Sequence, residues 1–359
     1  MALLARPAAL ATATGVAVLL ACPLAVAARE RDIPDAGAVL TGAAADHAHL
    51  KDTVLRREAP VMRAARARAG ASVYTSADGY RVEVEVSPAY PPDPAGDQAL
   101  VDFLGSRLHG PEFGGLAVYV GTPREIQHLC GGGAGVVACY SIGEGRMYVP
   151  GESVGGIPVE YPLTHEYGHH VASWRSNNPW DALDWGAKHW ASATRVCAHV
   201  RRGRLFPGNQ GAHYRDDPGE GFADGYAHLH YPQTPWYFNE LMRPGPAQFA
   251  AIRRDVLHPW SRPRSRTFRG SAGPRRAVRR FRIRVRLDGE LRVRLTGPRR
   301  ATYEVQAETP GFAAGGRLRA GAGFGVEWCR RRPAELVKLT VRRRRGPAGR
   351  FALRVSWPG

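Results

Sequence analysis

His165, Glu166 and His169 have the types and the spacing of residues that hydrolyse a bond at a metal ion. They form His-Glu-x-x-His in the stretch 164–170, which reads as part of a helix, and helical residues four apart share a face. Two imidazoles side by side suit zinc, which in catalytic sites takes three protein ligands and one water. Glu166 is then expected to accept that water's proton as a general base.

The alternative without a metal is that these histidines form part of a solvated helix face or lie in the core. With 13 histidines in 359 residues, the pentapeptide is expected by chance only about 0.02 times. Gly168 lies between the two histidines, and because a glycine inside a helix is costly it indicates close packing against another backbone. The flanking residues are apolar, namely Leu163, Val171, Ala172 and Trp174. This context favours a metal site.

A third ligand is available in the stretch 217–226. Its Asp-Pro-Gly start predicts a turn into a second helix, on which Glu220 and Asp224 lie one turn apart. Glu220 is able to bind the metal, and Asp224 is able to accept the other ring N–H of a metal-bound histidine and fix its orientation. The alternative is an ordinary acidic first turn, which the helix dipole favours.

His-Glu-x-x-His followed by Glu220-x-x-x-Asp224 resembles the signature of the gluzincin metallopeptidases. The longer metzincin pattern is excluded, because Ala172 and Arg175 stand where it requires Gly and His. The resemblance implies a zincin-like domain that binds Zn²⁺ through His165, His169 and Glu220, with Glu166 as general base and Asp224 beside a zinc-bound histidine. It implies a secreted zinc metalloendopeptidase. The 50 residues between His169 and Glu220 exceed the thermolysin-like spacing, so an insertion is expected.

Two other functions remain open. The first is an extracellular protein that binds a polyanion or a cell surface and has a structural zinc site. Such a site needs four protein ligands, and the only further candidate, His170, points away from the shared face. The second is a zinc amidase acting on cell-wall peptides. Tyr214, six residues before Glu220, is a candidate to donate a hydrogen bond to the oxyanion, in competition with other tyrosines nearby.

Residues 1–27 read as an export signal. Arg6 precedes an apolar run at 8–20, and small residues at 25–27 form a cleavage site. Secretion is therefore predicted, with lipidation at Cys22 in a loose lipobox as the alternative. No other stretch approaches the length of a membrane span.

Four cysteines remain after removal of this signal, an even number in an oxidising compartment. Cys130 and Cys139 bracket a glycine-rich loop, a short closure that is sterically easy, and are expected to form a disulfide. Cys197 with Cys329 follows only by elimination.

The formal net charge is +18 and comes almost wholly from arginine, since Lys51, Lys188 and Lys338 are the only lysines. Such a charge predicts attraction to anionic surfaces such as cell-wall polymers or lipid head groups. The base composition of the source genome would produce the same bias. Nucleic acid is not expected as a partner, because no nucleic-acid-binding motif accompanies the charge.

The expected fold class is α+β, a zincin-like domain at 79–260 followed by an all-β sandwich at 267–359. Residues 28–78 are expected to be a spacer or pro-segment, with a helical stretch over 46–69. Alternation at 81–86 predicts a strand, and a hairpin is expected before the motif helix. By resemblance to zincins, the second hairpin strand, at 147–149, would be the sheet edge that pairs with a peptide substrate.

Strict alternation recurs after a Pro/Arg linker at 262–266, in the runs 281–287, 291–295, 337–341 and 351–355. Turn signals such as Asp288-Gly289 separate these runs, which is typical of a β-sandwich. The region resembles the C-terminal sandwich domains of secreted bacterial peptidases. That resemblance implies attachment to a surface or substrate, or assistance in maturation.

Overall fold

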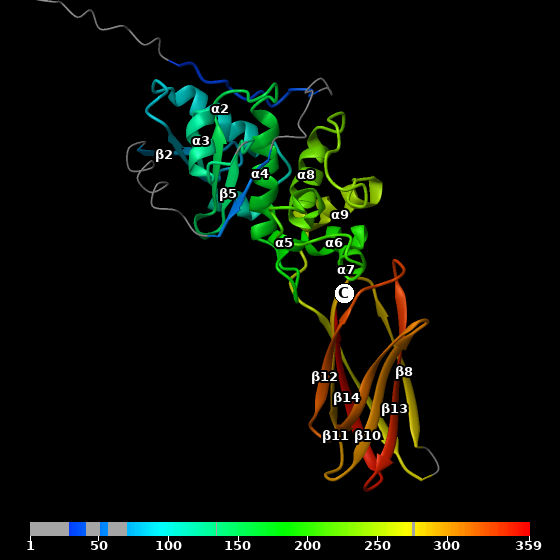
Figure 1. Cartoon of the computed structure of the whole chain (residues 1–359). Coiled ribbons are helices and arrows are strands. Elements are labelled where there is room, and N and C mark those ends of the chain that lie inside the picture. Colours follow the sequence, from blue (N-terminus) through cyan, green and yellow to red (C-terminus); the bar gives the residue numbers. More distant parts are fainter. Residues whose placement is uncertain (1–28, 41–50, 57–69, 134, 275–276) are drawn as a thin grey trace, which may run out of the picture.

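The computed structural model describes residues 29–40, 51–56, 70–133, 135–274 and 277–359. Figure 1 shows a mixed helix and sheet part followed by an elongated β part, with the C-terminus at their junction. We refer to residues 29–258 as the N-terminal part and to residues 264–357 as the sandwich. None of the helices in the described ranges combines the length and the apolar character that a membrane crossing requires.

The N-terminal part is built on a six-stranded mixed sheet in the order β1-β5-β6-β4-β3-β2. β3, β4 and β6 are parallel to one another, β2 is antiparallel to β3, β5 is antiparallel to β6, and β1 runs parallel to β5. Every residue of β4 and β6 is buried, as expected for central strands covered on both faces. The bounds are β1 (Val54–Leu55), β2 (Ala71–Thr75), β3 (Arg81–Val86), β4 (Ala117–Gly121), β5 (Cys139–Ser141) and β6 (Arg146–Pro150).

Local signals place the helices that pack on this sheet. Thr122 caps the first turn of α3 by accepting a hydrogen bond from the Glu125 backbone at 3.2 Å, and proline follows it at the first helical position. Three short helices, α5 to α7, lie in the interval between α4 and α8. The helices are α2 (Pro94–Gly105), α3 (Pro123–Leu129), α4 (Glu160–Ser173), α5 (Ala182–Trp185), α6 (Lys188–Thr194), α7 (Val196–Val200), α8 (Pro218–His230) and α9 (Pro246–Leu257), with short 3₁₀ turns at η2 (Pro111–Gly115), η3 (Ile142–Glu144) and η4 (Tyr214–Asp216).

The sandwich consists of two four-stranded sheets, β11-β10-β13-β8 and β12-β9-β14-β7. Inward residues of both sheets form one apolar core, so the mixed α+β fold with a β-sandwich-like second part agrees with the sequence. β7 begins inside the predicted linker, and glycines in β11 and β12 hid those strands from sequence reasoning. The strands are β7 (Arg264–Ala272), β8 (Val278–Val285), β9 (Gly289–Thr296), β10 (Thr302–Thr309), β11 (Phe312–Arg319), β12 (Gly323–Trp328), β13 (Glu335–Arg345) and β14 (Gly349–Trp357).

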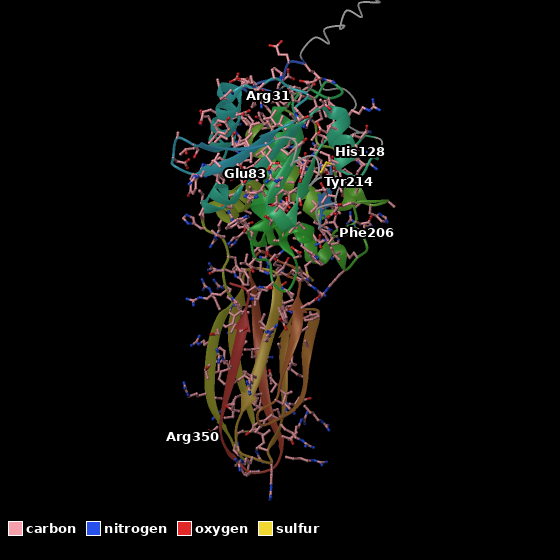
Figure 2. The ribbon with its side chains drawn as sticks, turned by 90° about the vertical axis from the view of Figure 1, so that its left-hand side faces the viewer. Arg31, Glu83, His128, Phe206, Tyr214 and Arg350 are labelled. Atoms are coloured by element: carbon pink, nitrogen blue, oxygen red, sulfur yellow. A yellow bond between two sulfur atoms is a disulfide. The ribbon has the colours of Figure 1, made fainter. Side chains whose placement is uncertain are left out.

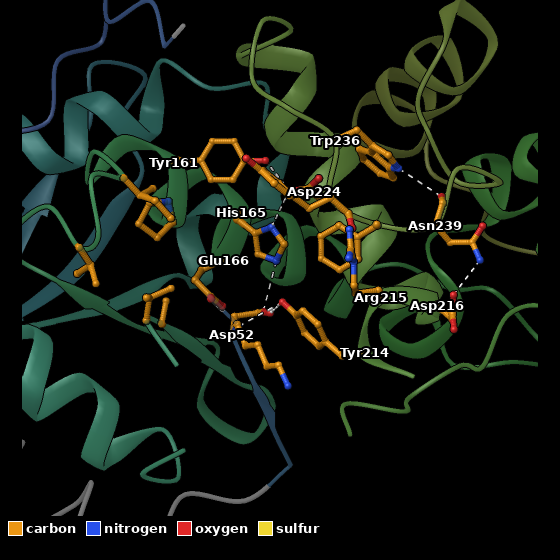
Figure 3. Close-up of a pocket in the computed structure, with 18 of the residues that line it drawn as sticks. Asp52, Tyr161, His165, Glu166, Tyr214, Arg215, Asp216, Asp224, Trp236 and Asn239 are labelled. Carbon is orange, nitrogen blue, oxygen red and sulfur yellow. Dashed lines mark hydrogen bonds and ion pairs between the residues drawn. The ribbon is translucent and has the colours of Figure 1, made fainter. Parts of the chain in front are cut away.

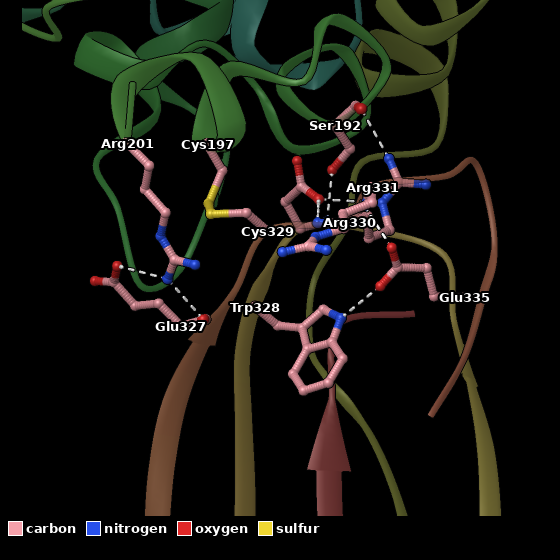
Figure 4. Close-up of a disulfide and its surroundings, with 10 residues drawn as sticks. Ser192, Cys197, Arg201, Glu327, Trp328, Cys329, Arg330, Arg331 and Glu335 are labelled. Atoms are coloured by element: carbon pink, nitrogen blue, oxygen red, sulfur yellow. Dashed lines mark hydrogen bonds and ion pairs between the residues drawn. A yellow bond between two sulfur atoms is a disulfide. The ribbon is translucent and has the colours of Figure 1, made fainter. Parts of the chain in front are cut away.

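A covalent bond and a buried polar network join the two parts (Figure 4). The disulfide links Cys197 of α7 to Cys329, directly after β12. Next to it, the Arg330 guanidinium donates to Asp288 Oδ1 at 3.1 Å and to the Ser192 carbonyl at 2.7 Å. The second predicted disulfide, between Cys130 and Cys139, is also present.

Three expectations need correction or fall outside the described chain. Residues 147–149 are not at the sheet edge, because β6 lies between β5 and β4 and both its sides are paired. Of the predicted helix at 46–69, the described residues 51–56 contain strand β1, since pairing with β5 overrides a weak helical pattern. The export signal and Cys22 lie outside the described residues.

Candidate metal centre

Helix α4 carries the histidine motif through the middle of the N-terminal part, and residues 160–172 are all buried. It packs against α8 at a point where neither helix has a bulky side chain. A Cβ added to Gly168 would lie 2.8 Å from the Ala223 Cα and 3.0 Å from its carbonyl oxygen. The expectation of close backbone packing at Gly168 is thus confirmed, and this approach brings residues of α8 next to those of α4.

Four buried side chains meet where α4, α8 and the N-terminal segment converge: Asp52, His165, His169 and Glu220. Their potential ligand atoms all lie within 4.8 Å of one another. Glu220 Oε2 is 3.5 Å from His165 Nε2 and 3.3 Å from His169 Nε2. Asp52 Oδ2 is 3.4 Å from His165 Nε2 and 2.9 Å from His169 Nε2.

These separations fit one tetrahedral ion. Four ligands at zinc's usual bond lengths of about 2.1 Å would lie about 3.4 Å from one another. Among the described residues, His165 Nε2 and Glu220 Oε2 are buried without a hydrogen-bond partner. Burial lowers the pKa of His169, but the charges and hydrogen bonds of Glu220 and Asp52 outweigh it and raise the pKa to about 10. The cluster therefore favours a bound cation, and its two imidazoles and two carboxylates suit zinc.

Glu166 lies beside the cluster and is fully buried. Within the described chain, neither of its carboxylate oxygens has a hydrogen-bond partner. Burial, followed by the charge of Asp52, raises the pKa of this carboxyl well above its usual range. A buried carboxylate without a hydrogen-bond partner destabilises the fold, so its presence calls for an explanation. An acid–base role next to a metal is one such explanation.

Asp224 follows Glu220 by one turn of α8, as predicted, and approaches the opposite ring nitrogen of His165. Its Oδ1 lies 3.5 Å from His165 Nδ1 and accepts a hydrogen bond from the Tyr161 hydroxyl. Asp217 caps the same helix by accepting from the Gly219 backbone N–H at 2.9 Å, which fixes the first turn that carries Glu220. His170 is directed elsewhere, since its Nε2 lies 2.9 Å from the Glu112 carbonyl oxygen.

Asp52 is the member of the cluster that sequence reasoning missed. Its backbone N–H donates to the Tyr214 hydroxyl at 3.2 Å, and that hydroxyl donates in turn to Asp52 Oδ1. No local pattern marks Asp52, because it lies 113 residues before His165 and meets it only through the pairing of β1 with β5. Tyr214, a candidate from the sequence, is therefore at the cluster, where it contacts Asp52.

A cavity of about 750 Å³ opens beside the cluster (Figure 3). Its lining includes Lys51, Asp52, Val137 and Ala138, together with aromatic residues such as Tyr161, Trp236 and Phe238. His165, Glu166 and Tyr214 face the same space. A cavity of this size accommodates several residues of an extended chain or a small molecule.

Comparisons with known proteins give little guidance. No protein-family model matches the sequence, and no curated protein matches it. A Yersinia pseudotuberculosis-derived mitogen is 13% identical over 26% of this chain and 86% of its own, with a TM-score of 0.21. A de novo designed double-stranded β-helix is 15% identical over 26% of this chain and 96% of its own, with a TM-score of 0.18. The IMPa metallopeptidase in complex with T-antigen is 10% identical over 67% of this chain and 37% of its own, with a TM-score of 0.19. Similarities this weak carry no argument about fold or function.

Proposed function

We propose that this chain is a secreted zinc-dependent metallopeptidase of gluzincin type, with a zincin-like N-terminal part. One observation carries the proposal. His165, His169 and Glu220 converge on one point, and the partnerless carboxylate of Glu166 lies next to them on the wall of a large cavity. The two disulfides agree with an oxidising, extracellular location.

His165, His169 and Glu220 would hold the zinc. When bound, zinc supplies Lewis acidity that lowers the pKa of water and polarises a carbonyl. Glu166 takes the proton of the attacking water and passes it to the leaving nitrogen, so that the peptide C–N bond breaks and a carboxylate and an amine form. Asp224 orients His165 through its Nδ1. Tyr214, whose hydroxyl donates to Asp52 in this structure, would donate a hydrogen bond to the oxygen that gains negative charge.

The test is Glu166→Gln, which keeps the size of the side chain but cannot accept a proton. Zinc content and melting temperature should stay near those of the parent, while hydrolysis of a peptide library falls by about 10²-fold to 10⁴-fold. Glu166→Gln is introduced into two parent proteins, the unchanged full chain and its Asp52→Ala variant. The second parent is needed because Asp52 contacts His169, one of the proposed zinc ligands. Glu160→Gln, on the same helix but bonded to the Asp35 backbone, is the matched control. Cleavage that Glu166→Gln leaves unchanged, or no cleavage by either parent, contradicts the proposal. Cell-wall peptides belong in the library, because a zinc amidase would use the same residues.

A structural zinc site is the second candidate, and Asp52 is the observation that favours it. With Asp52 the cluster has four protein donors, the number that closes a structural site. A structural site does not require the partnerless carboxylate of Glu166 or a cavity that reaches the metal. Glu166 and the cavity therefore favour the peptidase.

We also propose that the sandwich binds an anionic cell-surface polymer. Figure 2 shows nitrogen-tipped side chains projecting from both sides of the sandwich, with Arg350 toward the end remote from the N-terminal part. Arg294 and Arg354 stand directly opposite each other on neighbouring strands, an arrangement that is unfavourable without an anion between or above them. Gly323 and Gly325 line the same groove of about 590 Å³, which also contains Arg292 and the Glu290 carboxylate that pairs with it.

A further inference from the structure

Residues 51–56, which we refer to as the strap, lie along β5 and carry Asp52 into the metal cluster. Two backbone bonds hold its start, from the Lys51 N–H to the Gly135 carbonyl at 2.8 Å and from the Val137 N–H to the Lys51 carbonyl at 2.9 Å. A third runs from the Tyr140 N–H to the Thr53 carbonyl at 3.1 Å. The strap is thus the outermost strand of the sheet and also part of the cavity wall.

The two oxygens of the Asp52 carboxylate reach two different functional groups. Oδ2 lies 2.9 Å from His169 Nε2, on the side where the metal ligands converge. Oδ1 accepts the hydrogen bond of Tyr214, which is the donor proposed for the reacting oxygen. One carboxylate therefore spans the metal position and the hydrogen-bond donor, which is the placement expected of the carboxylate that peptide hydrolysis releases.

We propose that the strap is an autoinhibitory element, in which Asp52 occupies the position of the substrate's reacting group until the strap is displaced. This inference rests on the proposed peptidase function and concerns the regulation of the same site. Displacement leaves His165, His169 and Glu220, the three-ligand set that catalytic zinc sites use. The fourth position and Tyr214 then become available to a substrate.

The strap blocks a second requirement of peptide binding. An extended peptide docks by adding a strand to a free sheet edge. In the described chain β1 is the edge strand next to the cluster, and it covers the edge that β5 would otherwise present. A peptide that needs this edge must therefore compete with the strap for the same backbone groups of β5.

The strap is held by a short strand and by ion pairs of the exposed Arg56 side chain with Asp184 and Asp181, and exposed ion pairs contribute little to stability. β1 has only two residues, Val54 and Leu55, and both are half-buried. β2 pairs separately with β3 on the opposite side of the sheet. Displacement of the strap therefore leaves the order of the other five strands intact.

The experiment compares the full secreted chain with Asp52→Ala and Asp52→Asn, and with Thr53→Ala as a control within the strap. Bound zinc is measured by elemental analysis after dialysis, and the affinity for acetohydroxamate, a metal chelator, is measured by calorimetry. Melting curves identify which variants are folded, and peptide hydrolysis is measured separately. If the Asp52 carboxylate competes as a tethered ligand, both Asp52 variants keep about one zinc and bind acetohydroxamate at least about 10-fold more tightly than the parent. Hydrolysis rises in the same variants, and Thr53→Ala behaves as the parent.

Three results overturn the inference. In the first, both Asp52 variants fold but lose zinc, which makes Asp52 a permanent ligand of a structural site. In the second, zinc stays and the acetohydroxamate affinity does not change. In the third, both variants fail to fold, which makes the strap an integral part of the structure. Retained zinc with tighter acetohydroxamate binding but no hydrolysis supports displacement of Asp52 from the metal and counts against the peptidase function alone.

Discussion

Gly168 of α4 and Ala223 of α8 lie so close that their helices approach almost backbone to backbone. A Cβ at residue 168 would lie only 2.8 Å from the Ala223 Cα, closer than real Cβ atoms come to a neighbouring backbone. Gly168 is on the same helix as His165 and His169, and Ala223 is on the same helix as Glu220. The separation of these three side chains is therefore set by a glycine that makes no polar contact with them.

Gly168→Ala should push the two helices apart. The helix propensity of alanine favours the change by roughly 1 kcal/mol, but overpacking against a backbone typically costs 1–3 kcal/mol, so we expect lower stability and weaker zinc binding. Gly225→Ala in α8 is the matched control, because its Cβ would come no closer than 3.4 Å, to the flexible end of Ile252. Urea unfolding and zinc titration of both variants provide the check. Equal behaviour of the two would show that the contact does not set the ligand geometry.

Purified protein should contain about one zinc per chain. His169→Ala should weaken zinc binding by more than the 10-fold to 100-fold that is typical of losing a residue that only hydrogen-bonds to a metal ligand. His170→Ala, the neighbouring position, should keep the metal, since His170 contacts the Glu112 carbonyl and the Tyr140 hydroxyl instead. Competition with a coloured zinc chelator measures both affinities. Stoichiometric zinc of unchanged affinity in His169→Ala would remove this histidine from the ligand set.

Replacing Cys197 and Cys329 together by serine should destabilise the protein by about 2–4 kcal/mol, because the bond closes a loop of 132 residues. Removal of the Cys130–Cys139 bond, which spans only 9 residues, should cost less. Calorimetry is the measurement, and we expect the first variant to show separate transitions for the two parts. A single unshifted transition would mean that the noncovalent contacts at the junction are sufficient.

Because Lys188 is buried, we expect the free energy of unfolding to depend on pH. Burial lowers its pKa from 10.5 to about 7, with Asp288 and Asp255 partly opposing the shift. Between these values the unfolded chain binds a proton that the folded chain does not, so the contribution of Lys188 to stability increases with pH. From pH 7.5 to 9.5 the parent should gain about 2–3 kcal/mol relative to Lys188→Met.

Urea unfolding at both pH values measures this difference for Lys188→Met. The control is Lys338→Met, at an exposed lysine of the sandwich that pairs with Glu308. A constant gap between the parent and Lys188→Met across this range would show that the lysine stays charged in the folded protein.

Substitution of Arg294 and Arg354 by serine should weaken binding to an anionic polymer such as teichoic acid or heparin, and should lower the salt dependence of binding. Removing two like charges that face each other should leave the fold intact or slightly stabilise it. The control replaces Arg280 and Arg282 of β8, on the other sheet, in the same way. Equal losses in both double variants would indicate attraction by net charge rather than by the groove.

Local periodicity carried most of what the sequence predicted. The alternation at 81–86 became β3 with the same bounds, and His165 and His169 share a helix face because their spacing is a helical turn. α2 begins at Pro94, where Asp93 caps the helix and proline occupies its first position, and both are local signals of a helix start.

Pairings between distant segments were not predictable in this way. A hairpin pattern does not show which of its strands lies nearer the edge of the sheet. β6 was therefore wrongly placed at the edge, although β5 and then β1 lie outside it. Asp52 reaches the cluster through β1, a strand of two residues within a stretch rich in alanine and arginine. Such a short strand acquires its structure from its partner and leaves no periodic signal of its own.

The disulfide between Cys197 and Cys329 also changes what a protease can do to this protein. A single peptide connection joins the two parts, and Ser261, Arg262 and Pro263 in it are exposed to proteases. A cut there would leave two fragments held together by the disulfide, so that the nicked protein would migrate as one species until a reductant is added. Under the proposed attachment of the sandwich to a surface, such a cut would therefore not release the N-terminal part from that surface.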